Sequence, residues 1–385
     1  MFGKRFTLFK IFGFAIRVDM SWLVILTLVV WSLAASEFPE EHPGQSWGTY
    51  LLMGLVGALG LFGSVVIHEL CHSLVARRYG LQMEGITLFI FGGVAEMSEE
   101  PPNPKTELLM AIAGPISSLV LGAASVFAAY LVAVSGGWRG AFVTLRWIGI
   151  VNIVLAVANL IPGYPLDGGR VLRSILWHVT GRLRWATRIA SYVGEGFGLF
   201  LVGTGLVILL WGNPVGGMWN ILIGWFLWSA AKQGYQQVLV RQALAGEPVQ
   251  RLMSAEPVTV PPTISLEQLV SDYVYRFHYK MFPVVEDGRL AGCITTREVR
   301  DVPRTEWASR TVGEVARGCE AGNTIAAGAD ALAALGQMSR TGASRLMVVD
   351  GQRLVGIVSL KDLMGLLARK MELEGDDPQQ PGIQA

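Results

Sequence analysis

The sequence predicts an α-helical membrane domain of six spans, with small re-entrant or β elements, followed by a soluble α/β region that repeats one unit. Of the 385 residues, 52% are hydrophobic and only 16% are charged, and the mean hydropathy is +0.45. This composition is too apolar for an ordinary soluble domain. The long apolar runs lie within residues 1–240, whereas the composition after residue 241 is that of a globular protein.

Apolar segments and the positions of positive charges determine the predicted topology. The predicted spans are residues 21–36, 48–75, 108–134, 145–161, 190–211 and 218–231. Lys and Arg concentrate in residues 1–19, 77–105, 170–188 and after 232. With six spans, these four segments all lie on one side of the membrane, and positive charge marks the cytoplasmic side. We therefore expect a multi-pass protein of the cell membrane with both termini in the cytoplasm.

Two stretches of the membrane domain allow more than one structure. Residues 1–19 mix basic and apolar side chains, which suits short β-strands or an interfacial segment. The apolar run that follows has the order of a secretory signal, but its length and the later spans favour a retained helix. Residues 81–97 are apolar but too short to span, and Gly92-Gly93 interrupts them. They favour a β-hairpin or a re-entrant segment over a helix.

Net charge and cysteine content exclude several classes of protein. The formal net charge is +1, so nothing in the sequence indicates nucleic-acid binding. The three cysteines, Cys71, Cys293 and Cys319, are odd in number and far apart. They indicate neither a disulfide framework nor a zinc site built on cysteine pairs. We expect Cys71, which lies between two histidines in the sequence, to be a small apolar helix residue rather than a ligand.

The second predicted span carries the motif His68-Glu69-Leu-Cys-His72. On a helix the two histidines lie one turn apart and leave the same face, so both can hold one metal ion. Glu69 is close enough to act on a water that the metal binds. Ionisable side chains in a membrane helix are costly and are therefore functional candidates. The alternative is that neighbouring helices simply satisfy the three polar side chains.

A catalytic zinc site needs at least one more protein ligand and an open position. Asp167 is the best candidate, because it follows the fourth span in a stretch rich in proline and glycine that turns the chain back towards the membrane. Glu84 and Glu96, at the ends of the re-entrant segment, are alternatives. The other histidines lie at unsuitable depths: His42, His178 and His278.

These residue types predict peptide hydrolysis. Zinc would lower the pKa of its bound water to near neutral, and Glu69 would take the proton and pass it to the leaving amine. A helical substrate must unwind locally, because helix hydrogen bonds hide its carbonyl groups. Asn159 could hydrogen-bond the extended substrate, or it could be a polar helix cap. The edge at Gly92-Gly93 could pair with the substrate as an added strand, or it could be a plain turn.

The soluble region contains two similar copies, residues 249–306 and 311–371, after a linker at 241–248. Each copy predicts a helix, a two-stranded hairpin and a closing helix. The hairpin turns are Asp287-Gly288 and Asp350-Gly351, which lie between apolar runs. Residues 372–385 are polar and contain several glycines, prolines and glutamines, so we expect a disordered tail.

Two motifs, in this order, resemble the site-2 protease family of intramembrane zinc metalloproteases. One is His68-Glu69-x-x-His72, followed by Gly92-Gly93 and Gly114-Pro115. The other is Asn159-x-x-Pro162-x-x-Pro165-Leu-Asp167-Gly168. The resemblance covers residues 1–235. It implies that His68, His72 and Asp167 bind Zn²⁺ and that Glu69 is the catalytic base. It also implies that the substrates are transmembrane segments of single-span membrane proteins.

The C-terminal copies resemble a tandem pair of cystathionine-β-synthase (CBS) domains, which often bind adenine nucleotides and often associate. The stretch Gly356-Ile-Val-Ser359-Leu-Lys-Asp362 matches the family pattern, in which Ser359 would meet the phosphate and Asp362 the ribose of ATP or AMP. In the first copy Thr295 and Glu298 take these positions, with Glu in place of Asp. The resemblance implies a homodimer. The alternative is an unliganded dimerisation or docking module.

Three functions fit parts of this pattern. The first is an intramembrane zinc metalloendopeptidase for regulated intramembrane proteolysis, whose activity responds to adenine nucleotide through the CBS pair. The second is a CBS-gated transporter or channel, which would need ionisable residues along several spans. The third, fifth and sixth predicted spans have almost none, so the protease is favoured. The third function, an inactive protease-like scaffold, is disfavoured because every expected catalytic residue is present.

Overall fold

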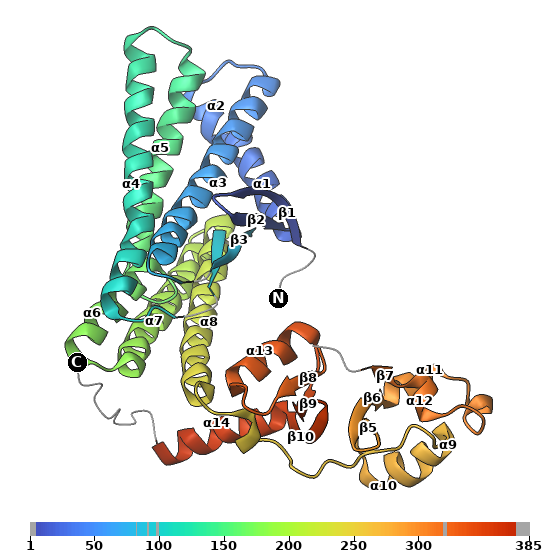
Figure 1. The fold of residues 1–385 in the computed structure, drawn as a ribbon. Helices are drawn as coiled ribbons and strands as arrows, with labels where there is room; N and C mark the ends of the chain where they lie inside the picture. Colours follow the sequence, from blue (N-terminus) through green and yellow to red (C-terminus); the bar gives the residue numbers. More distant parts are fainter. Residues whose placement is uncertain (1–4, 82, 91, 98–99, 319–321, 375–385) are drawn as a thin grey trace. The chain divides into compact units, whose positions relative to one another are not determined.

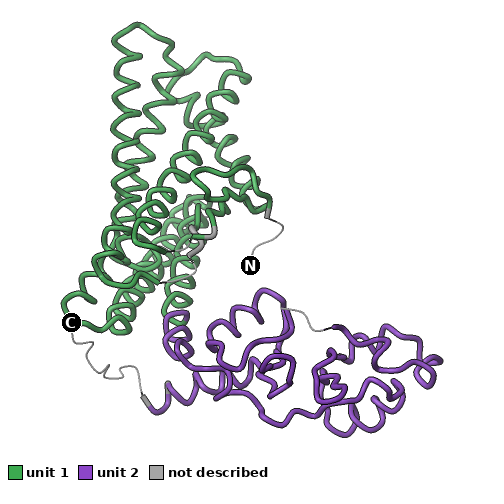
Figure 2. Tube along the Cα trace, viewed as in Figure 1, with its two compact units in different colours: residues 1–236 green, residues 237–385 purple. Residues whose placement is uncertain are grey.

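The computed structural model describes residues 5–81, 83–90, 92–97, 100–318 and 322–374. The chain divides into two compact units, residues 1–236 and residues 237–385 (Figure 2). The first unit consists of long helices and one small sheet, and the second consists of two small sheets with short helices (Figure 1). Each unit has its own hydrophobic clusters.

Over the described residues, the first unit contains five helical segments that are long and apolar enough to cross a membrane. They are Met20–Glu41, which contains α1 (Met20–Ser32) and α2 (Phe38–Glu41), then α3 (Trp47–Arg78), α4 (Pro104–Val134), α5 (Arg139–Asn159) and α7 (Leu183–Leu210). A shorter helix, α6 (Asp167–Thr180), comes between α5 and α7 in the chain. Five of the predicted spans overlap these five segments.

The predicted count of six spans is not confirmed. Its sixth segment, residues 218–231, lies within α8 (Pro214–Leu244), which is long but is not among the five. The reason is composition. Residues 214–231 contain Pro214, Asn220, three glycines and three tryptophans, and these residues lower the hydropathy compared with an aliphatic run.

Polar side chains mark where the apolar helices begin. Asp19 accepts a hydrogen bond from a backbone N–H in the first turn of α1, Ser46 does so for α3, and Asn103 does so for α4. These side chains satisfy N–H groups that have no partner within the helix. The caps therefore leave fewer unsatisfied backbone donors at the start of each of these helices.

The small sheet joins the two stretches whose structure the sequence left open. It contains β1 (Arg5–Ile11), β2 (Phe14–Asp19), β3 (Met83–Phe89) and β4 (Gly92–Met97), in the order β1-β2-β3-β4. β2 and β3 pair in parallel, and the other pairs are antiparallel. Both stretches are therefore strands, and β4 is an edge strand of the described sheet.

The sheet packs on the part of α3 that carries the two histidines of the motif. Ile16 of β2 lies opposite Ile86 of β3, and both side chains are buried against Leu70 of α3. Leu70 lies between His68 and His72 in the sequence, so the sheet supports the helix at this level. The contact also fixes β3 and β4 near the motif.

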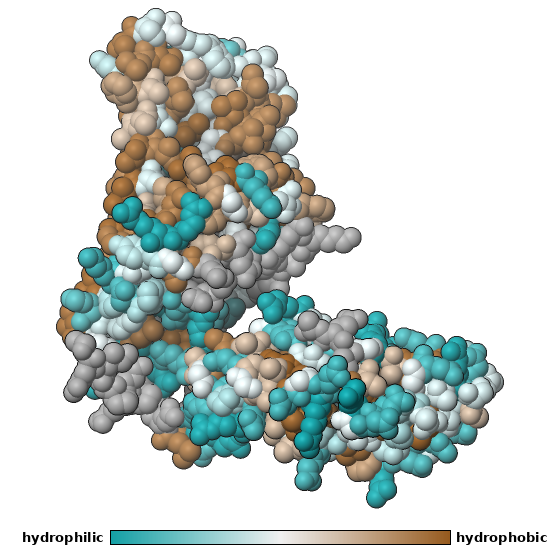
Figure 3. All heavy atoms as spheres, viewed as in Figure 1, coloured by the Kyte–Doolittle hydropathy of each residue, from teal (hydrophilic) through white to brown (hydrophobic). Residues whose placement is uncertain are grey.

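Large apolar side chains cover the outer faces of the long helices. Val120 and Phe127 on α4 are more than half exposed, as are Val154 and Val157 on α5. Figure 3 shows this apolar surface over α4 and α5. A soluble protein rarely exposes so much contiguous apolar surface, whereas lipid solvates it well. The first unit is therefore a multi-pass membrane domain.

The second unit contains two three-stranded sheets. The first has the order β5-β6-β7 and the second the order β10-β9-β8. Its strands are β5 (Met281–Glu286), β6 (Arg289–Thr295), β7 (Arg317–Gly318), β8 (Thr324–Ala326), β9 (Arg345–Asp350) and β10 (Arg353–Ser359). Its helices are α9 (Leu266–Gln268), α10 (Tyr275–Phe277), α11 (Thr296–Asp301), α12 (Val312–Val315), α13 (Ala331–Thr341) and α14 (Leu360–Glu374). Both predicted hairpins, β5–β6 and β9–β10, are present.

In the second unit, each sheet and its hydrophobic core include residues from the other sequence repeat. Val249, at the start of the first repeat, is buried with Leu346 in the core of the second. Ser254 pairs with Ile357 of β10 through two backbone hydrogen bonds. Conversely, Val312 from the second repeat is buried in the first core. The sequence repeats and the packed cores therefore have different boundaries.

The predicted tail begins at residue 372. Residues 372–374 belong to α14. Residues 375–385 lie outside the described residues, as does Cys319.

Candidate active site and metal centre

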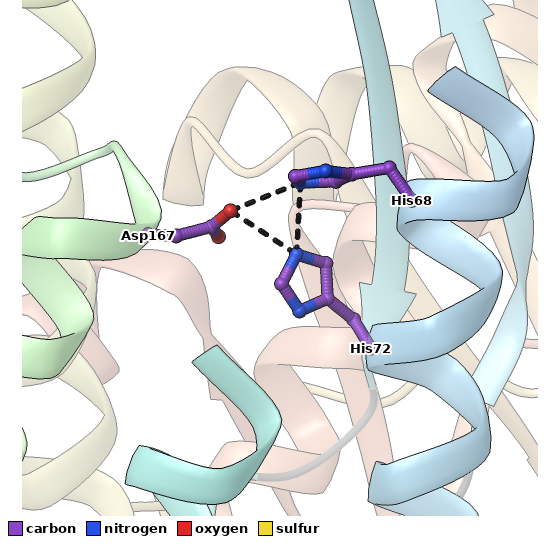
Figure 4. Close-up of side chains that lie close together, drawn as sticks. All are labelled: His68, His72 and Asp167. Carbon is purple, nitrogen blue, oxygen red and sulfur yellow. Dashed lines mark hydrogen bonds and ion pairs between the residues drawn. The ribbon is translucent and has the colours of Figure 1, made fainter. Parts of the chain in front are cut away.

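Three side chains from two distant segments meet at one point. His68 Nε2 lies 3.0 Å from Asp167 Oδ2, and His72 Nε2 lies 3.2 Å from the same oxygen. The two Nε2 atoms are 3.1 Å apart. Figure 4 shows both imidazoles of α3 and the carboxylate of α6 pointing towards one another. All three residues are buried, with 4%, 5% and 9% of their surface exposed.

The second nitrogen of each imidazole has its own partner. His72 Nδ1 lies 2.6 Å from the carbonyl oxygen of Met110, and His68 Nδ1 lies 2.9 Å from Ser118 Oγ. A carbonyl only accepts, so His72 Nδ1 donates and Nε2 presents its lone pair towards Asp167. Such partners fix both the tautomer and the orientation of a metal-binding histidine. Met110 and Ser118 both belong to α4.

Gly114 of α4 forms the wall against which the imidazoles lie. A Cβ atom at this position would lie 2.5 Å from His68 Nε2 and closer still to His72 Nε2. Real Cβ atoms do not approach other atoms so closely, so any side chain here would displace the rings. Glycine is therefore required at position 114 because of close approach.

The loop between α5 and α6 delivers Asp167 to the histidines. The backbone N–H of Leu166 donates to the Gly163 carbonyl at 3.0 Å, and that of Gly169 donates to the Leu166 carbonyl at 3.0 Å. The Tyr164 N–H donates to the Ala190 carbonyl of α7, also at 3.0 Å. These bonds hold a compact turn against α7. As a result α6 begins with Asp167 at the level of the imidazoles.

Glu69 lies beside the edge of the small sheet. It is half-buried and does not belong to the three-residue cluster. A Cβ atom at Gly93 would lie 2.9 Å from Glu69 Cγ and 3.1 Å from a methyl group of Val65. The backbone of β4 therefore packs directly against the Glu69 side chain. Gly92, which precedes it, has a φ of 131° that favours glycine.

Other predicted site residues have different surroundings. Asn159 Nδ2 donates to the Leu155 carbonyl within α5 at 3.1 Å, and no bond to the cluster is present among the described side chains. The side chains of Glu84 and Glu96 lie outside the described part of the structure. Over the residues searched, the cluster of possible metal ligands contains no cysteine and no histidine besides His68 and His72.

The sequence matches two known families along most of its length. The pattern of peptidase family M50 matches residues 56–136 and 137–201, and the CBS domain matches residues 249–304 and 323–369. Rip3 of Mycobacterium tuberculosis, which carries a zinc metalloprotease name, is 36% identical over 362 residues, which cover 93% of this chain and 91% of Rip3.

This chain belongs to peptidase family M50, the site-2 proteases. Two further relatives support the assignment. Zinc metalloprotease MJ0392 of Methanocaldococcus jannaschii is 30% identical over 370 residues, which cover 95% of this chain and 98% of that one. The protein sll0528 of Synechocystis, also named as a zinc metalloprotease, is 37% identical over 309 residues, which cover 79% of each chain.

Membership of the M50 family implies a zinc ion, and the converging residues fit one. Two imidazole nitrogens and one carboxylate oxygen form a usual donor set for catalytic zinc, which leaves a fourth position open. The three donor atoms lie within 4.8 Å of one another. The hydrogen bonds at both Nδ1 atoms leave the Nε2 atoms to face the shared point.

Several M50 site contacts were not predicted from the sequence. They are the hydrogen bonds of the imidazoles to the Met110 carbonyl and to Ser118, and the packing of both rings against Gly114. A backbone carbonyl carries no sequence signal. Ser118, however, lies one helical turn after Gly114, so the helical spacing itself could have indicated it.

The four residues predicted for nucleotide binding cap two helices. Ser359 donates from both N and Oγ to Asp362 Oδ2, at 2.8 and 2.6 Å, at the start of α14. Thr295 and Glu298 make the same capping box at the start of α11. Burial opposes the charged form of Glu298, but the hydrogen bonds from Thr295 outweigh it and hold the pKa of this carboxyl below its ordinary value.

Proposed function

We propose that this chain is a zinc-dependent intramembrane endopeptidase that cleaves transmembrane segments of single-span membrane proteins. The convergence of His68, His72 and Asp167 among apolar helices carries this proposal, and Glu69 beside them completes a hydrolytic site. The family assignment supports the same conclusion.

Each residue has a distinct role in the proposed reaction. His68, His72 and Asp167 would hold the metal. A zinc ion bound by such residues makes water a nucleophile at neutral pH and polarises a peptide carbonyl. Glu69 takes a proton from the attacking water and passes it to the nitrogen of the leaving amine. Ser118 and the Met110 carbonyl keep both imidazoles in the orientation that this reaction needs.

The edge of β4 is the proposed docking site for the unwound substrate. It is an edge strand of the described sheet, and its Gly92-Gly93 backbone lies against Glu69. An extended peptide can add to such an edge through backbone hydrogen bonds. The substrate carbonyl would then lie close to Glu69. Asn159, at the end of α5, would bind the extended chain further along, after its amide leaves the Leu155 carbonyl.

We also propose six spans in the cell membrane, with α8 as the sixth and both termini in the cytoplasm. The distribution of Lys and Arg favours this topology over five spans. The CBS pair would then lie in the cytoplasm, where ATP or AMP could bind between the two copies and modulate proteolysis. The match of Gly356 to Asp362 with the CBS pattern supports this regulation, and the CBS pair would also favour a homodimer.

The decisive test compares the parent protein with Glu69→Gln in vesicles that also hold a single-span substrate. We expect the variant to keep its zinc and to lose cleavage, because it lacks the base but retains the three ligands. Glu195→Gln, in the apolar helix α7, is the matched control and should cleave normally. If Glu69→Gln cuts as well as the parent, Glu69 is not the catalytic base. If the parent binds zinc without cutting any single-span protein, a transporter or an inactive scaffold becomes the better interpretation.

A further inference from the structure

One face of α4 orients both imidazoles of the candidate site. Met110, Gly114 and Ser118 follow one another at steps of four residues, so they lie along one face of the helix. Met110 orients His72, Gly114 seats both imidazoles, and Ser118 orients His68. Glu107 comes three residues before Met110 and continues this face towards the start of the helix. None of these contacts accounts for the position of the third cluster residue, Asp167, which belongs to α6.

Glu107 forms a buried ion pair with α6. Its side chain has no exposed surface, and Glu107 Oε1 accepts from Arg173 Nε at 2.6 Å and from Arg173 Nη2. Arg173 is only 4% exposed. Arg170 of α6 approaches the same oxygen to 3.9 Å. All the ion pairs of Glu107 within the described residues therefore come from the helix that starts with Asp167.

The ion pair and the metal-ligand cluster are two contacts between the same two helices. Arg173 lies six residues after Asp167, or ~9 Å along α6 at ~1.5 Å per residue. Glu107 lies seven residues before Gly114, or ~10 Å along α4. The two separations match, and the helices run in opposite directions here. When Glu107 meets Arg173, Asp167 is therefore at the level of the imidazoles that rest on Gly114.

Arg173 also contacts the loop that leads into Asp167. Its guanidinium lies 5.8 Å from the centre of the Tyr164 ring, and Tyr164 is three residues before Asp167. One side chain thus joins α4, through Glu107, to the turn that delivers the carboxylate.

We propose that Glu107 and Arg173 are positioning residues that set the register of α6 on α4, and so place the Asp167 carboxylate on the two histidine Nε2 atoms. This inference rests on the proposed role of Asp167 as a zinc ligand. A buried ion pair is a poor source of stability, since similar hydrophobic residues often stabilise a protein as well or better. The pair is better explained as a contact that specifies one register of α6 on α4. In keeping with this, Glu107 Oε2 has no partner within the described part of the chain.

The test uses the full-length protein in detergent and the double variant Glu107→Gln/Arg173→Met, which removes both charges and keeps similar volumes. Zinc affinity is measured by competition with a chromophoric chelator, and the ligand geometry is read from the visible absorption of bound Co²⁺. We expect zinc affinity to fall about 10- to 100-fold, the usual range when support for a ligand is lost. The Co²⁺ spectrum should weaken or shift, while the unfolding midpoint stays close to that of the parent.

The control is Met53→Ala, which weakens packing on α3 far from α6. Met53 is buried with Phe38 and Val143, so this variant should lose stability and keep the zinc affinity of the parent. The proposal is overturned if the double variant binds zinc as tightly as the parent, or if its affinity falls no more than that of Met53→Ala. A parent protein that binds no zinc would refute the proposed function itself.

A second variant covers the case in which the double variant does not fold. Arg173→Lys keeps the charge but has neither the length nor the forked donors of arginine. A loss of zinc affinity of about 10-fold at an unchanged unfolding midpoint supports the positioning role. An affinity equal to that of the parent overturns it.

Discussion

His68 Nε2 and Asp167 Oδ2 lie 3.0 Å apart although 99 residues separate them in the chain. The contact joins α3 to the first residue of α6, and the intervening helix α4 supplies the groups that orient both imidazoles. The candidate metal centre is therefore a property of three packed helices. Its parts can be perturbed one at a time.

Removal of the Ser118 hydroxyl tests how much the support of His68 contributes to metal binding. In Ser118→Ala, His68 Nδ1 loses its partner at 2.9 Å and the imidazole is less well oriented. We expect zinc affinity to fall about 10- to 100-fold, measured by chelator competition. Ser117→Ala is the matched control, because the Ser117 hydroxyl donates to the Gly114 carbonyl of its own helix and makes no bond to either histidine among the described residues. Equal affinities for the two variants would contradict the role of Ser118.

A methyl group at Gly114 tests the close approach of the imidazoles to α4. In Gly114→Ala the new Cβ would lie within about 2.5 Å of both Nε2 atoms, so the rings must move away from Asp167. We expect the purified variant to carry much less than one zinc per chain by elemental analysis, while its helix content is unchanged. Gly203→Ala in α7 places a methyl in open space and should retain zinc. Full zinc occupancy in Gly114→Ala would show that the rings do not rest on this residue.

Gly93→Ala separates the position of Glu69 from metal binding. The added Cβ would lie 2.9 Å from Glu69 Cγ, so either Glu69 or β4 must shift. A misplaced catalytic group can cost about 100-fold in rate. We expect cleavage to fall by about that factor while zinc content stays at the level of the parent. Gly196→Ala in α7 is the control, since nothing lies near its Cβ. A Gly93→Ala protein that cuts normally would place the reaction away from this strand.

Asp362→Ala tests nucleotide binding by the CBS pair. The variant loses the capping box of α14, which costs about 1 kcal/mol of stability, and it loses the group expected to meet the ribose. Asp330→Ala is a matched control, because Asp330 caps α13 of the same copy by accepting from Leu332 N. We expect both variants to lose similar stability and only Asp362→Ala to lose ATP or AMP binding, measured by calorimetry. Unchanged binding in Asp362→Ala would remove the proposed site.

The ion pair between Glu247 and Lys370 should stabilise α14 at neutral pH, and this stabilisation should be lost in acid. The hydrogen bond from Lys370 Nζ, at 2.8 Å, holds the pKa of Glu247 below its ordinary value of 4.5. A carboxyl whose pKa is lowered by folding stabilises the folded state above its unfolded pKa, and this contribution disappears as pH falls through the folded pKa. The pair is partly exposed, so its contribution is at most about 1 kcal/mol.

The measurement is amide hydrogen exchange of α14 in the parent and in Glu247→Gln, compared at the same pH. We expect the parent to be better protected at about pH 7, and the difference between the two proteins to shrink as the pH falls through the lowered pKa of Glu247. Glu306→Gln, which breaks an exposed pair with Arg310, is the control and should leave α14 unchanged. A difference in protection between the parent and Glu247→Gln that does not shrink with falling pH would contradict this account.

Features that depend on neighbouring residues could be predicted from the sequence. Contacts between residues far apart in the chain could not. The two histidines at i and i+4, the capping residues and the Asp-Gly turns all depend on neighbours within a few positions. In contrast, residues 14–19 and 83–89 form parallel strands β2 and β3, and only their pairing decides that both are strands. The Glu107–Arg173 pair joins residues 66 positions apart, so no local pattern indicates it.

The sixth predicted span is helical, as expected, but it is less apolar than the other five. Residues 218–231 lie in the long helix α8, yet their mixture of glycine, tryptophan and Asn220 falls outside the composition of the five apolar helices. Helix formation and membrane insertion depend on different properties of the side chains, so a helix can be present where the hydropathy signal is weak.

The sequence by itself determined which functional groups are available for the site. These are two imidazoles on one helical face, a neighbouring glutamate and an aspartate after a proline- and glycine-rich stretch, with apolar helices around them. Only the tertiary structure decided that Asp167 meets both imidazoles, that Gly114 leaves room for them and that β4 lies against Glu69. The reason is that donor type is a property of single residues, whereas a position good to a fraction of an ångström comes from the packing of segments far apart in the chain.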